Sequence, residues 1–257
     1  MEMKELILKR AAELGPVLGI SGEKTEELRR NLAFEFSADG EITKDSAAKA
    51  IDHTILSFNA AEDDVLRICE EAKRYGFAAV CVNPVWVKTA AEFREKNGAC
   101  FKIATVIDFP LGASTAEARV AEAGKAAADG ADELDLVIGI GLLKSGKLRE
   151  TYESIRALAE MKCFLKVILE TSALTDSEKV DAALLAFFAG AKMLKTSTGV
   201  NGKATVDDVR LLRAVAGKSL GVKAAGGIRD KETLLAMMRA GADRIGCSSS
   251  VSIMENW

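Results

Sequence analysis

Short apolar runs alternate with longer amphipathic segments through most of this chain, and this alternation limits the folds that the chain can adopt. The runs are rich in β-branched and aliphatic residues, and helical patterns of about ten to sixteen residues separate them. They lie at 51–55, 78–82, 103–107, 134–138, 164–169, 193–196, 222–225 and 244–247. Strands that alternate with helices form right-handed βαβ units, so these strands should lie parallel in one sheet.

Eight such units within about 200 residues favour a closed (β/α)8 barrel, which is an α/β fold. An open doubly wound sheet is the alternative, and that fold usually carries a G-x-G-x-x-G loop after its first strand. No such loop follows the first run of this chain. We therefore predict a TIM barrel over residues 48–257.

The boundaries of the helices support this division. Ser114 with Glu117, and Thr175 with Glu178, have the spacing of a capping box. Three segments also repeat one pattern, in which a glycine that ends a helix is followed by alanine and a short strand. They are Gly130-Ala-Asp-Glu-Leu-Asp, Gly190-Ala-Lys-Met-Leu-Lys and Gly241-Ala-Asp-Arg-Ile-Gly. A repeated unit of this kind predicts an array of similar elements.

Residues 1–47 differ from the rest and predict an N-terminal helical extension. Apolar residues follow helical spacing over residues 3–14, and a second amphipathic pattern covers residues 24–36. These helices could close the bottom of the barrel or form a subunit contact, and the sequence favours neither.

The composition bears on partners and location. The chain has 35 Lys and Arg residues against 38 Asp and Glu, a net charge of −3, so neither a nucleic acid nor a membrane is expected as a partner. No run is long enough to span a bilayer, and no basic segment followed by an apolar stretch opens the chain. The five cysteines show no CxxC spacing and the chain has a single histidine, which argues against zinc. We expect a soluble, cytoplasmic protein with reduced thiols.

Charged side chains recur in or at the ends of the predicted strands. They are Asp52, Asp108, Asp135, Lys166, Lys195 and Lys223. Equivalent positions on successive barrel strands point into one lumen, so these groups should converge near the C-terminal mouth, where barrels carry their chemistry. A purely stabilising layer of ion pairs is the alternative, although buried charge stabilises a fold weakly.

Lys195 lies in the apolar run Met193-Leu194-Lys195-Thr196. An ordinary strand-end lysine would pair with a carboxylate. A lysine that is buried beside another cation instead has a destabilised ammonium form, so a free amine exists near neutral pH. Such an amine adds to a carbonyl and gives an imine, which accepts electrons when the neighbouring C–C bond breaks. A carboxylate can move the protons, and no metal is needed.

Two loops carry signals for phosphate. Gly226-Gly227 follows the seventh run, and residues 246–250 (Gly-Cys-Ser-Ser-Ser) follow the eighth. Barrels often bind phosphate in these two loops through backbone N–H groups.

Together these motifs resemble the deoxyribose-phosphate aldolase family of class I aldolases over residues 48–254. Seven motifs occur in the family's order: Ile51-Asp52-His53-Thr54, Val80-Cys81-Val82-Asn83-Pro84, Phe109-Pro110-Leu111-Gly112, Glu133-Leu134-Asp135, Leu165-Lys166-Val167-Ile168-Leu169-Glu170, Lys195-Thr196-Ser197-Thr198-Gly199 and Lys223-Ala-Ala-Gly226-Gly227-Ile-Arg229. The resemblance implies a (β/α)8 barrel that cleaves 2-deoxy-D-ribose 5-phosphate reversibly to D-glyceraldehyde 3-phosphate and acetaldehyde, without a cofactor.

The resemblance also implies roles for residues. Lys195 would be the Schiff-base lysine, Lys223 the lysine that keeps it deprotonated, and Asp135 the proton relay. Lys166 and Asp52 would complete the network. The phosphate would be held by Gly199, Gly226, Gly227, Gly246, Ser248 and Ser249. Because the N-terminal helices could form a subunit contact, a homo-oligomer is expected, with a dimer favoured.

Some positions depart from the family pattern. Asp108 stands before Phe-Pro where the family usually has a small or neutral residue, and Val200 follows Gly199 where an aromatic residue or a lysine is common. His53 beside Asp52 could be hydrogen-bonded filler or touch the substrate. Two other functions stay open: another lysine-dependent aldolase that acts on a ketose phosphate, and a non-catalytic barrel that binds a phosphorylated ligand.

Overall fold

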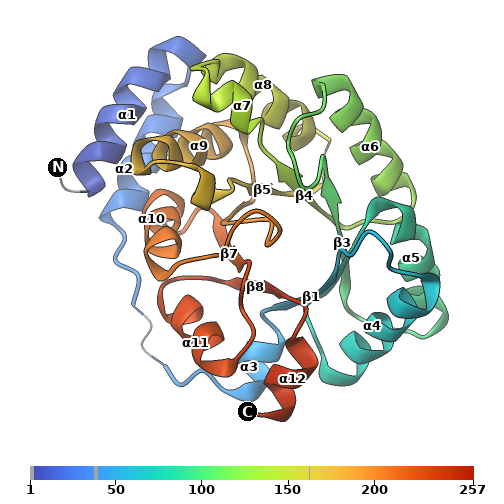
Figure 1. Cartoon of the computed structure of the whole chain (residues 1–257). Helices are drawn as coiled ribbons and strands as arrows, with labels where there is room; N and C mark the ends of the chain where they lie inside the picture. Colours follow the sequence, from blue (N-terminus) through green and yellow to red (C-terminus); the bar gives the residue numbers. More distant parts are fainter. Residues whose placement is uncertain (1–2, 38–39, 162) are drawn as a thin grey trace.

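The computed structural model describes residues 3–37, 40–161 and 163–257, and eight parallel strands form a closed barrel in it (Figure 1). The strands are β1 (Ile51–Ile55), β2 (Ala79–Val82), β3 (Lys102–Ile107), β4 (Glu133–Val137), β5 (Phe164–Ile168), β6 (Met193–Lys195), β7 (Gly221–Ala225) and β8 (Arg244–Cys247). Each strand pairs with its neighbours in chain order, and β1 pairs with β8 to close the sheet. The predicted (β/α)8 barrel is confirmed, and the open-sheet alternative is wrong.

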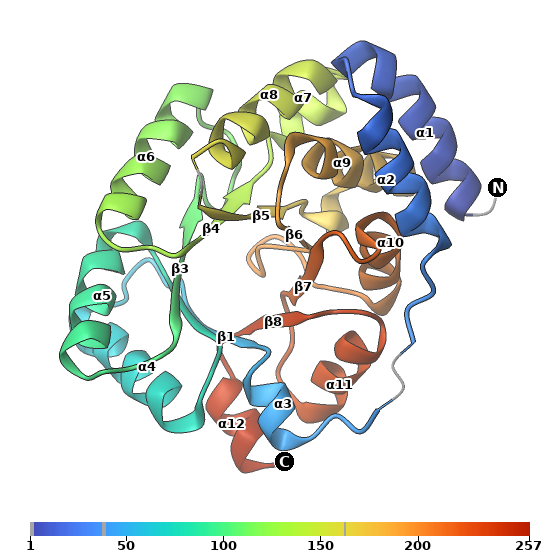
Figure 2. The ribbon, with the colours of Figure 1, turned by 180° about the vertical axis from the view of Figure 1, so that it is seen from behind.

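Helices form a ring outside the barrel, as both views show (Figures 1 and 2). They are α1 (Met3–Leu18), α2 (Gly22–Ala33), α3 (Lys44–Ala48), α4 (Glu62–Tyr75), α5 (Val87–Lys96), α6 (Ala116–Ala128), α7 (Ile140–Lys144), α8 (Leu148–Ala159), α9 (Asp176–Ala189), α10 (Val206–Ala216), α11 (Lys231–Arg239) and α12 (Ser250–Glu255), with 3₁₀ turns η1 (Pro84–Trp86) and η2 (Thr171–Ala173). None of the helices within the described residues is both long and apolar enough to cross a bilayer.

The helix starts agree only in part with the sequence prediction. Thr175 and Glu178 form the predicted capping box at the start of α9. At α6 the prediction was one residue early, because Thr115 is the N-cap and accepts from the backbone N–H of Ala118. The N–H of Ser114 instead donates to the carboxylate of Asp108. A tertiary partner therefore decides which of two neighbouring hydroxyl residues caps this helix.

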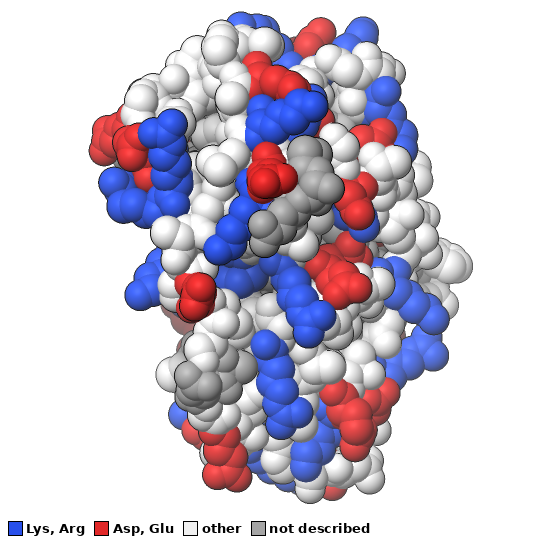
Figure 3. Space-filling model, turned by 90° about the vertical axis from the view of Figure 1, so that its left-hand side faces the viewer, with Lys and Arg blue, Asp and Glu red and all other residues white. Residues whose placement is uncertain are grey.

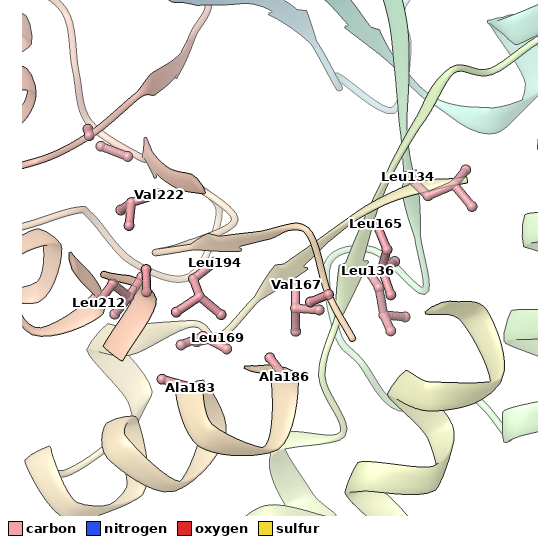
Figure 4. Packing of buried hydrophobic residues seen from close by; sticks show 14 of the residues in the cluster. Leu134, Leu136, Leu165, Val167, Leu169, Ala183, Ala186, Leu194, Leu212 and Val222 are labelled. Atoms are coloured by element: carbon pink, nitrogen blue, oxygen red, sulfur yellow. The ribbon is translucent and has the colours of Figure 1, made fainter. Parts of the chain in front are cut away.

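The main apolar core lies between the barrel and the helices. In Figure 4 the outward-facing Val167 and Leu194 lie opposite Ala183 and Ala186 of α9. All four side chains are buried. Alanines on the helix let it approach the sheet closely, so the strand side chains fill the space between them.

The inside of the barrel has two unlike halves. Strands β2 and β3 contribute Ala79, Cys81, Ala104 and Val106, which form a small apolar cluster separate from the main core. Residues on β1 and on β4 to β8 contribute charged side chains. One wall of the lumen is therefore apolar and the other is ionic.

Helices α1 and α2 pack against α9 and α10 on the outside of the ring rather than across the bottom of the barrel (Figures 1 and 2). Arg10 donates to both carboxylate oxygens of Asp181 at 2.6 and 2.7 Å, and Asn31 donates to the carbonyl of Val215 at 3.2 Å. Because α1 covers its outer side, α9 has ten of its fourteen residues buried. The outer face on this side mixes Lys and Arg with Asp and Glu (Figure 3).

Candidate active site

Five strands bring the lysines and carboxylates singled out in the sequence into one buried cluster. Asp52, Asp135, Lys166, Lys195 and Lys223 are each at most 3% exposed. Their strands place Asp135 directly beside Lys166, and Lys195 directly beside Lys223. Side chains alternate along a strand, so one register sends all five into the lumen.

Asp135 lies at the centre of this cluster and accepts from all three lysines. Its Oδ1 accepts from Nζ of Lys166 at 2.9 Å. Its Oδ2 accepts from Nζ of Lys195 and of Lys223, each at 2.8 Å. The Oδ2 of Asp52 lies 3.2 Å from Nζ of Lys166 and 2.5 Å from Nζ of Lys223. The two carboxylates therefore tie the three ammonium groups into one network.

The cluster keeps both carboxylates ionised. Burial opposes the charge of Asp135, but Lys166, Lys195 and Lys223 outweigh burial and hold the pKa of Asp135 well below its usual range. Burial also opposes the charge of Asp52, but the neighbouring Lys166, Lys223 and Arg244 lower the pKa of this carboxyl.

The three lysines differ in how well their charges are compensated. Burial works against the ammonium form of Lys166, but Asp135, Asp52 and Glu133 raise its pKa. The pKa of Lys223 is raised by Asp135 and Asp52 in spite of burial. Lys195 pairs with Asp135 alone, and burial together with nearby Lys223 lowers its pKa. Lys195 is therefore the lysine most able to exist as a free amine.

Glu133 and Arg244 complete the cluster at the N-terminal ends of their strands. The sequence analysis did not identify either of them as a site residue. The Oε2 of Glu133 lies 2.5 Å from Nζ of Lys166. Arg244 donates through Nε to Oδ1 of Asp52 at 2.7 Å and through its terminal nitrogens to Glu133. Glu133 precedes Asp135 by two positions on β4, and that alternation was the available signal.

A cavity of about 400 Å³ opens above the cluster at the C-terminal ends of the strands. Among the clustered residues, Lys195 lines this cavity. Its other lining residues include Thr54, Phe109, Gly199, Gly226, Gly227, Arg229, Gly246 and Ser248. Lys195 thus borders a space that can hold a small molecule.

The loops after β6 and β7 touch each other at the rim of this cavity. Gly226 has φ +103°, and a Cβ there would lie 2.8 Å from the carbonyl oxygen of Gly202. The carbonyl of Gly226 accepts from the N–H of Ala204 at 3.0 Å. Only glycine fits where the two loops come this close together. Because glycine has no side chain, it also leaves nearby backbone N–H groups uncovered, as phosphate binding requires.

Five of the six residues expected to hold phosphate line the cavity: Gly199, Gly226, Gly227, Gly246 and Ser248. Ser249 lies one position further on, directly before α12, and is not among the lining residues. Arg229 supplies an exposed cation at the rim that sequence reasoning did not assign. Its place two residues after Gly227 was the available signal.

Asp108 does not join the lumen cluster. Its backbone has φ +54°, in the left-handed region, and its carboxylate accepts from the N–H groups of Ala113 and Ser114 and from Nε of Arg119 at 2.7 Å. The expectation that Asp108 converges with the other charges was wrong, because this backbone turn directs its side chain toward α6. Asp tolerates such a conformation better than most residues.

His53 also points away from the cavity. Its Nδ1 lies 3.0 Å from Oγ of Ser250, and its Nε2 lies 2.6 Å from Oε2 of Glu71 on α4. Burial lowers its pKa, although Glu71 acts in the opposite direction. The geometry fits a hydrogen-bonded residue that joins β1 to α4 and α12. No group of three or more His, Cys, Asp or Glu residues in the described ranges is arranged to hold a metal ion.

Comparison with known proteins gives consistent results. A family model described as DeoC/LacD family aldolase matches residues 46–250. The chain is 53% identical over 213 residues to the deoxyribose-phosphate aldolase of Thermococcus gammatolerans, covering 81% of this chain and 95% of that protein. It is 49% identical over 216 residues to the one from a Geobacillus species, covering 82% and 96%. A deoxyribose phosphate aldolase structure from Aeropyrum pernix, described as tetrameric, superposes with a TM-score of 0.78 at 32% identity, covering 92% of this chain and 97% of that one.

Proposed function

The chain belongs to the DeoC/LacD family of aldolases, and from this premise we propose that it is a deoxyribose-phosphate aldolase that works through an imine on Lys195. The reaction is the reversible cleavage of 2-deoxy-D-ribose 5-phosphate to D-glyceraldehyde 3-phosphate and acetaldehyde. The observation that carries the role of Lys195 is its position. It is the clustered lysine that faces the cavity, and its pKa is lowered.

The phosphate end of the substrate is held at the rim. Gly199, Gly226, Gly227, Gly246 and Ser248 line the cavity there, and Arg229 adds positive charge. Backbone N–H groups and a hydroxyl are suitable donors to a phosphate. Ser249 is included in this proposal as the residue next to Ser248. Anchoring the phosphate directs the aldehyde carbon of the open-chain sugar toward Lys195, so binding energy orients the reacting atoms.

The chemical steps start with the free amine of Lys195. Its nitrogen lone pair attacks C1 of the substrate, and loss of water from the carbinolamine leaves an iminium ion. The C3 hydroxyl loses its proton, the C2–C3 bond breaks, and its electron pair moves into the iminium to give an enamine. The three-carbon aldehyde phosphate departs. Protonation of the enamine at C2 and hydrolysis then release acetaldehyde and restore the amine.

The buried network supports these steps. Asp135 contacts Nζ of Lys195 at 2.8 Å, so it is placed to carry protons to and from the carbinolamine. Lys223 shares the same carboxylate oxygen and disfavours a second positive charge on Lys195. Lys166 and Asp52 hold Asp135 and Lys223 in place through their own ion pairs.

Borohydride trapping tests the imine directly. The protein is incubated with acetaldehyde or deoxyribose 5-phosphate, reduced, digested and mapped by mass spectrometry. A reduced adduct should appear on Lys195 and disappear in Lys195→Ala. Lys192→Ala, which removes an exposed lysine three positions earlier, is the matched control and should keep the adduct. An adduct on Lys166 or Lys223 would reassign the reacting lysine, and folded protein without any adduct would contradict the imine mechanism.

A panel of sugar phosphates separates this enzyme from an aldolase that acts on ketose phosphates. Cleavage of deoxyribose 5-phosphate should exceed cleavage of each ketose phosphate. The opposite ranking would assign the ketose alternative.

We also propose that the protein self-associates, with a dimer as the favoured form. The tetrameric description of the Aeropyrum pernix relative supports self-association in the family. Light scattering after size-exclusion chromatography measures the mass, and a monomer at micromolar concentration would refute this proposal.

A further inference from the structure

The pair Glu133 and Arg244 lies inside the barrel but away from the cavity. Neither residue lines the cavity, and both begin their strands, whereas Lys195 ends its strand. Their side chains are nonetheless nearly buried, with 8% of Glu133 and 15% of Arg244 exposed. They therefore form a second ionic layer beneath the three lysines.

Both members of this layer share partners with the lysines. Arg244 bonds Oδ1 of Asp52, while Lys166 and Lys223 contact Oδ2 of the same carboxylate. Glu133 approaches Nζ of Lys166, which in turn donates to Asp135. Each is thus connected through shared partners to Asp135, the carboxylate that bonds Lys195.

The whole cluster carries more positive than negative groups. Its negative groups are Asp52, Glu133 and Asp135, and its positive groups are Lys166, Lys195, Lys223 and Arg244. With every group ionised, one positive charge is in excess, and an unbalanced buried charge is unfavourable. Arginine does not lose its proton in proteins, so a proton released to relieve this excess comes from a lysine.

The contacts around Lys195 explain why this lysine, rather than Lys166 or Lys223, gives up its proton most easily. Facing it are Asp135 from β4, Lys223 from β7 and the thiol of Cys81 from β2, with Lys166 of β5 on the other oxygen of Asp135. Lys166 contacts three carboxylates and Lys223 contacts two, whereas Lys195 contacts one. Removing a proton from Lys195 therefore costs the fewest ion pairs.

We propose that Glu133 and Arg244 are positioning residues whose opposite charges set the net charge of the lumen, and thereby the fraction of Lys195 that is a free amine at neutral pH. This inference rests on the proposed role of Lys195 in imine formation. The charge of Arg244 gives the cluster its net positive charge. Glu133 limits that excess, so that Lys166 and Lys223 keep their protons.

The proposal predicts opposite effects for two neutralising substitutions. Arg244→Gln removes a positive charge, so the proton on Lys195 becomes less unfavourable and the acid limb of the pH profile should move to higher pH. Glu133→Gln removes a negative charge and should move that limb to lower pH. Each shift should be about one pH unit for a charge removed at this range inside a protein. The double variant restores the original excess and should return close to the wild-type profile.

The experiment measures the initial rate of adduct formation on Lys195 with acetaldehyde and cyanoborohydride, from about pH 5 to 10, a range that spans the ordinary and lowered lysine pKa values. Arg213→Gln is the matched control. Arg213 is also a buried arginine, but it bonds the carbonyls of Gly217 and Gly241 outside the lumen. Its loss should lower the unfolding temperature and leave the pH profile in place. Thermal unfolding of every variant establishes that it is folded, and Arg244→Met, which also removes the charge, replaces Arg244→Gln if the latter does not fold. Arg244→Lys, which keeps the charge, is the conservative variant.

Opposite shifts with recovery in the double variant support the proposal, as does an unshifted profile for Arg244→Lys. Shifts in the same direction, or adduct formation with unmoved profiles in both neutralised variants, would assign Glu133 and Arg244 a purely structural role. Absence of any adduct on Lys195 in the wild-type protein is a distinct result, because it refutes the proposed mechanism on which this inference depends.

Discussion

At the scale of single residues, Asp108 shows how one side chain can fix a loop of the cavity. Its backbone is left-handed, and its carboxylate bonds two N–H groups of the loop and the buried guanidinium of Arg119. Arg119 also donates to the carbonyl of Gly112 at 2.8 Å. Phe109, the next residue, lines the cavity. Asp108 therefore forms a structural ion pair with Arg119.

Replacing Asp108 by glycine should separate the effect of its backbone strain from that of its ion pair with Arg119. Asp108→Gly removes the strain of φ +54° but leaves Arg119, which is 2% exposed, without its carboxylate. Loss of one partner of a buried pair costs about 3–5 kcal/mol of unfolding free energy, measured by urea denaturation. Asp108→Gly with Arg119→Met should recover most of this loss. A double variant as unstable as the single one would mean that the pair is not the cause.

His53 gives a prediction about pH, because it is the only histidine of the chain. Burial lowers its pKa in the folded protein, whereas an unfolded histidine titrates near about 6.5. As the pH falls through that value, the unfolded chain takes up a proton that the folded chain does not, so stability decreases. Between pH 7.5 and 5.5 the unfolding free energy should drop by about 1 kcal/mol.

The matched variant is His53→Gln, which retains a polar group but does not titrate. Its urea midpoint should be lower than that of the wild type at pH 7.5 and should change less between pH 7.5 and 5.5. An equal slope in the two proteins would show that other groups produce the dependence.

At the scale of elements, the sequence was informative where a pattern is local. The eight strands, the capping box of α9 and the lumen positions of Asp52, Asp135 and the lysines follow from spacing and alternation. Arg244 was missed because a charged residue at the start of a strand looks the same whether it faces solvent or the lumen, whereas Glu133 could have been found from its spacing of two positions before Asp135. The directions of Asp108 and His53 depend on a left-handed turn and on partners from α4 and α12, which no local pattern encodes.

The contact between the loops after β6 and β7 yields a prediction at this scale. In Gly226→Ala the new Cβ would lie 2.8 Å from the backbone oxygen of Gly202, and φ +103° is unfavourable for alanine. Strain of about 1–3 kcal/mol should displace both loops. We expect KM for deoxyribose 5-phosphate to rise about tenfold, while acetaldehyde, which has no phosphate, still forms the adduct on Lys195.

Gly19→Ala is the control for backbone strain alone, since Gly19 has φ +68° and a Cβ at this position would meet no other atom within 4 Å. It should lower stability and leave KM unchanged. Equal KM values for Gly226→Ala and the wild type would argue against phosphate binding at these loops.

At the scale of the whole molecule, the N-terminal helices act as an outer layer for one side of the barrel. Helix α9 is buried on its inner side by β5 and β6 and on its outer side by α1. It lacks a polar outer face along most of its length, since Phe187, Phe188 and the alanines around them are buried. A helix that is apolar on both sides must be packed on both sides, because an exposed apolar face is unfavourable in water. The extension and the barrel should therefore unfold as one cooperative unit.

Two neighbouring residues of α1 test this cooperativity. Ile7 is fully buried and Leu8 is 44% exposed, so Ile7→Ala and Leu8→Ala remove comparable aliphatic side chains from opposite environments. Ile7→Ala should lower the unfolding free energy of the entire chain by about 2–5 kcal/mol, with a single transition and faster amide exchange in α9. Leu8→Ala should change it by less than about 0.5 kcal/mol. Because Ile7 lies outside the barrel, kcat/KM for deoxyribose 5-phosphate should be unaltered below the transition. Two separate transitions, with α9 exchange unchanged, would mean that the barrel is stable without its outer layer.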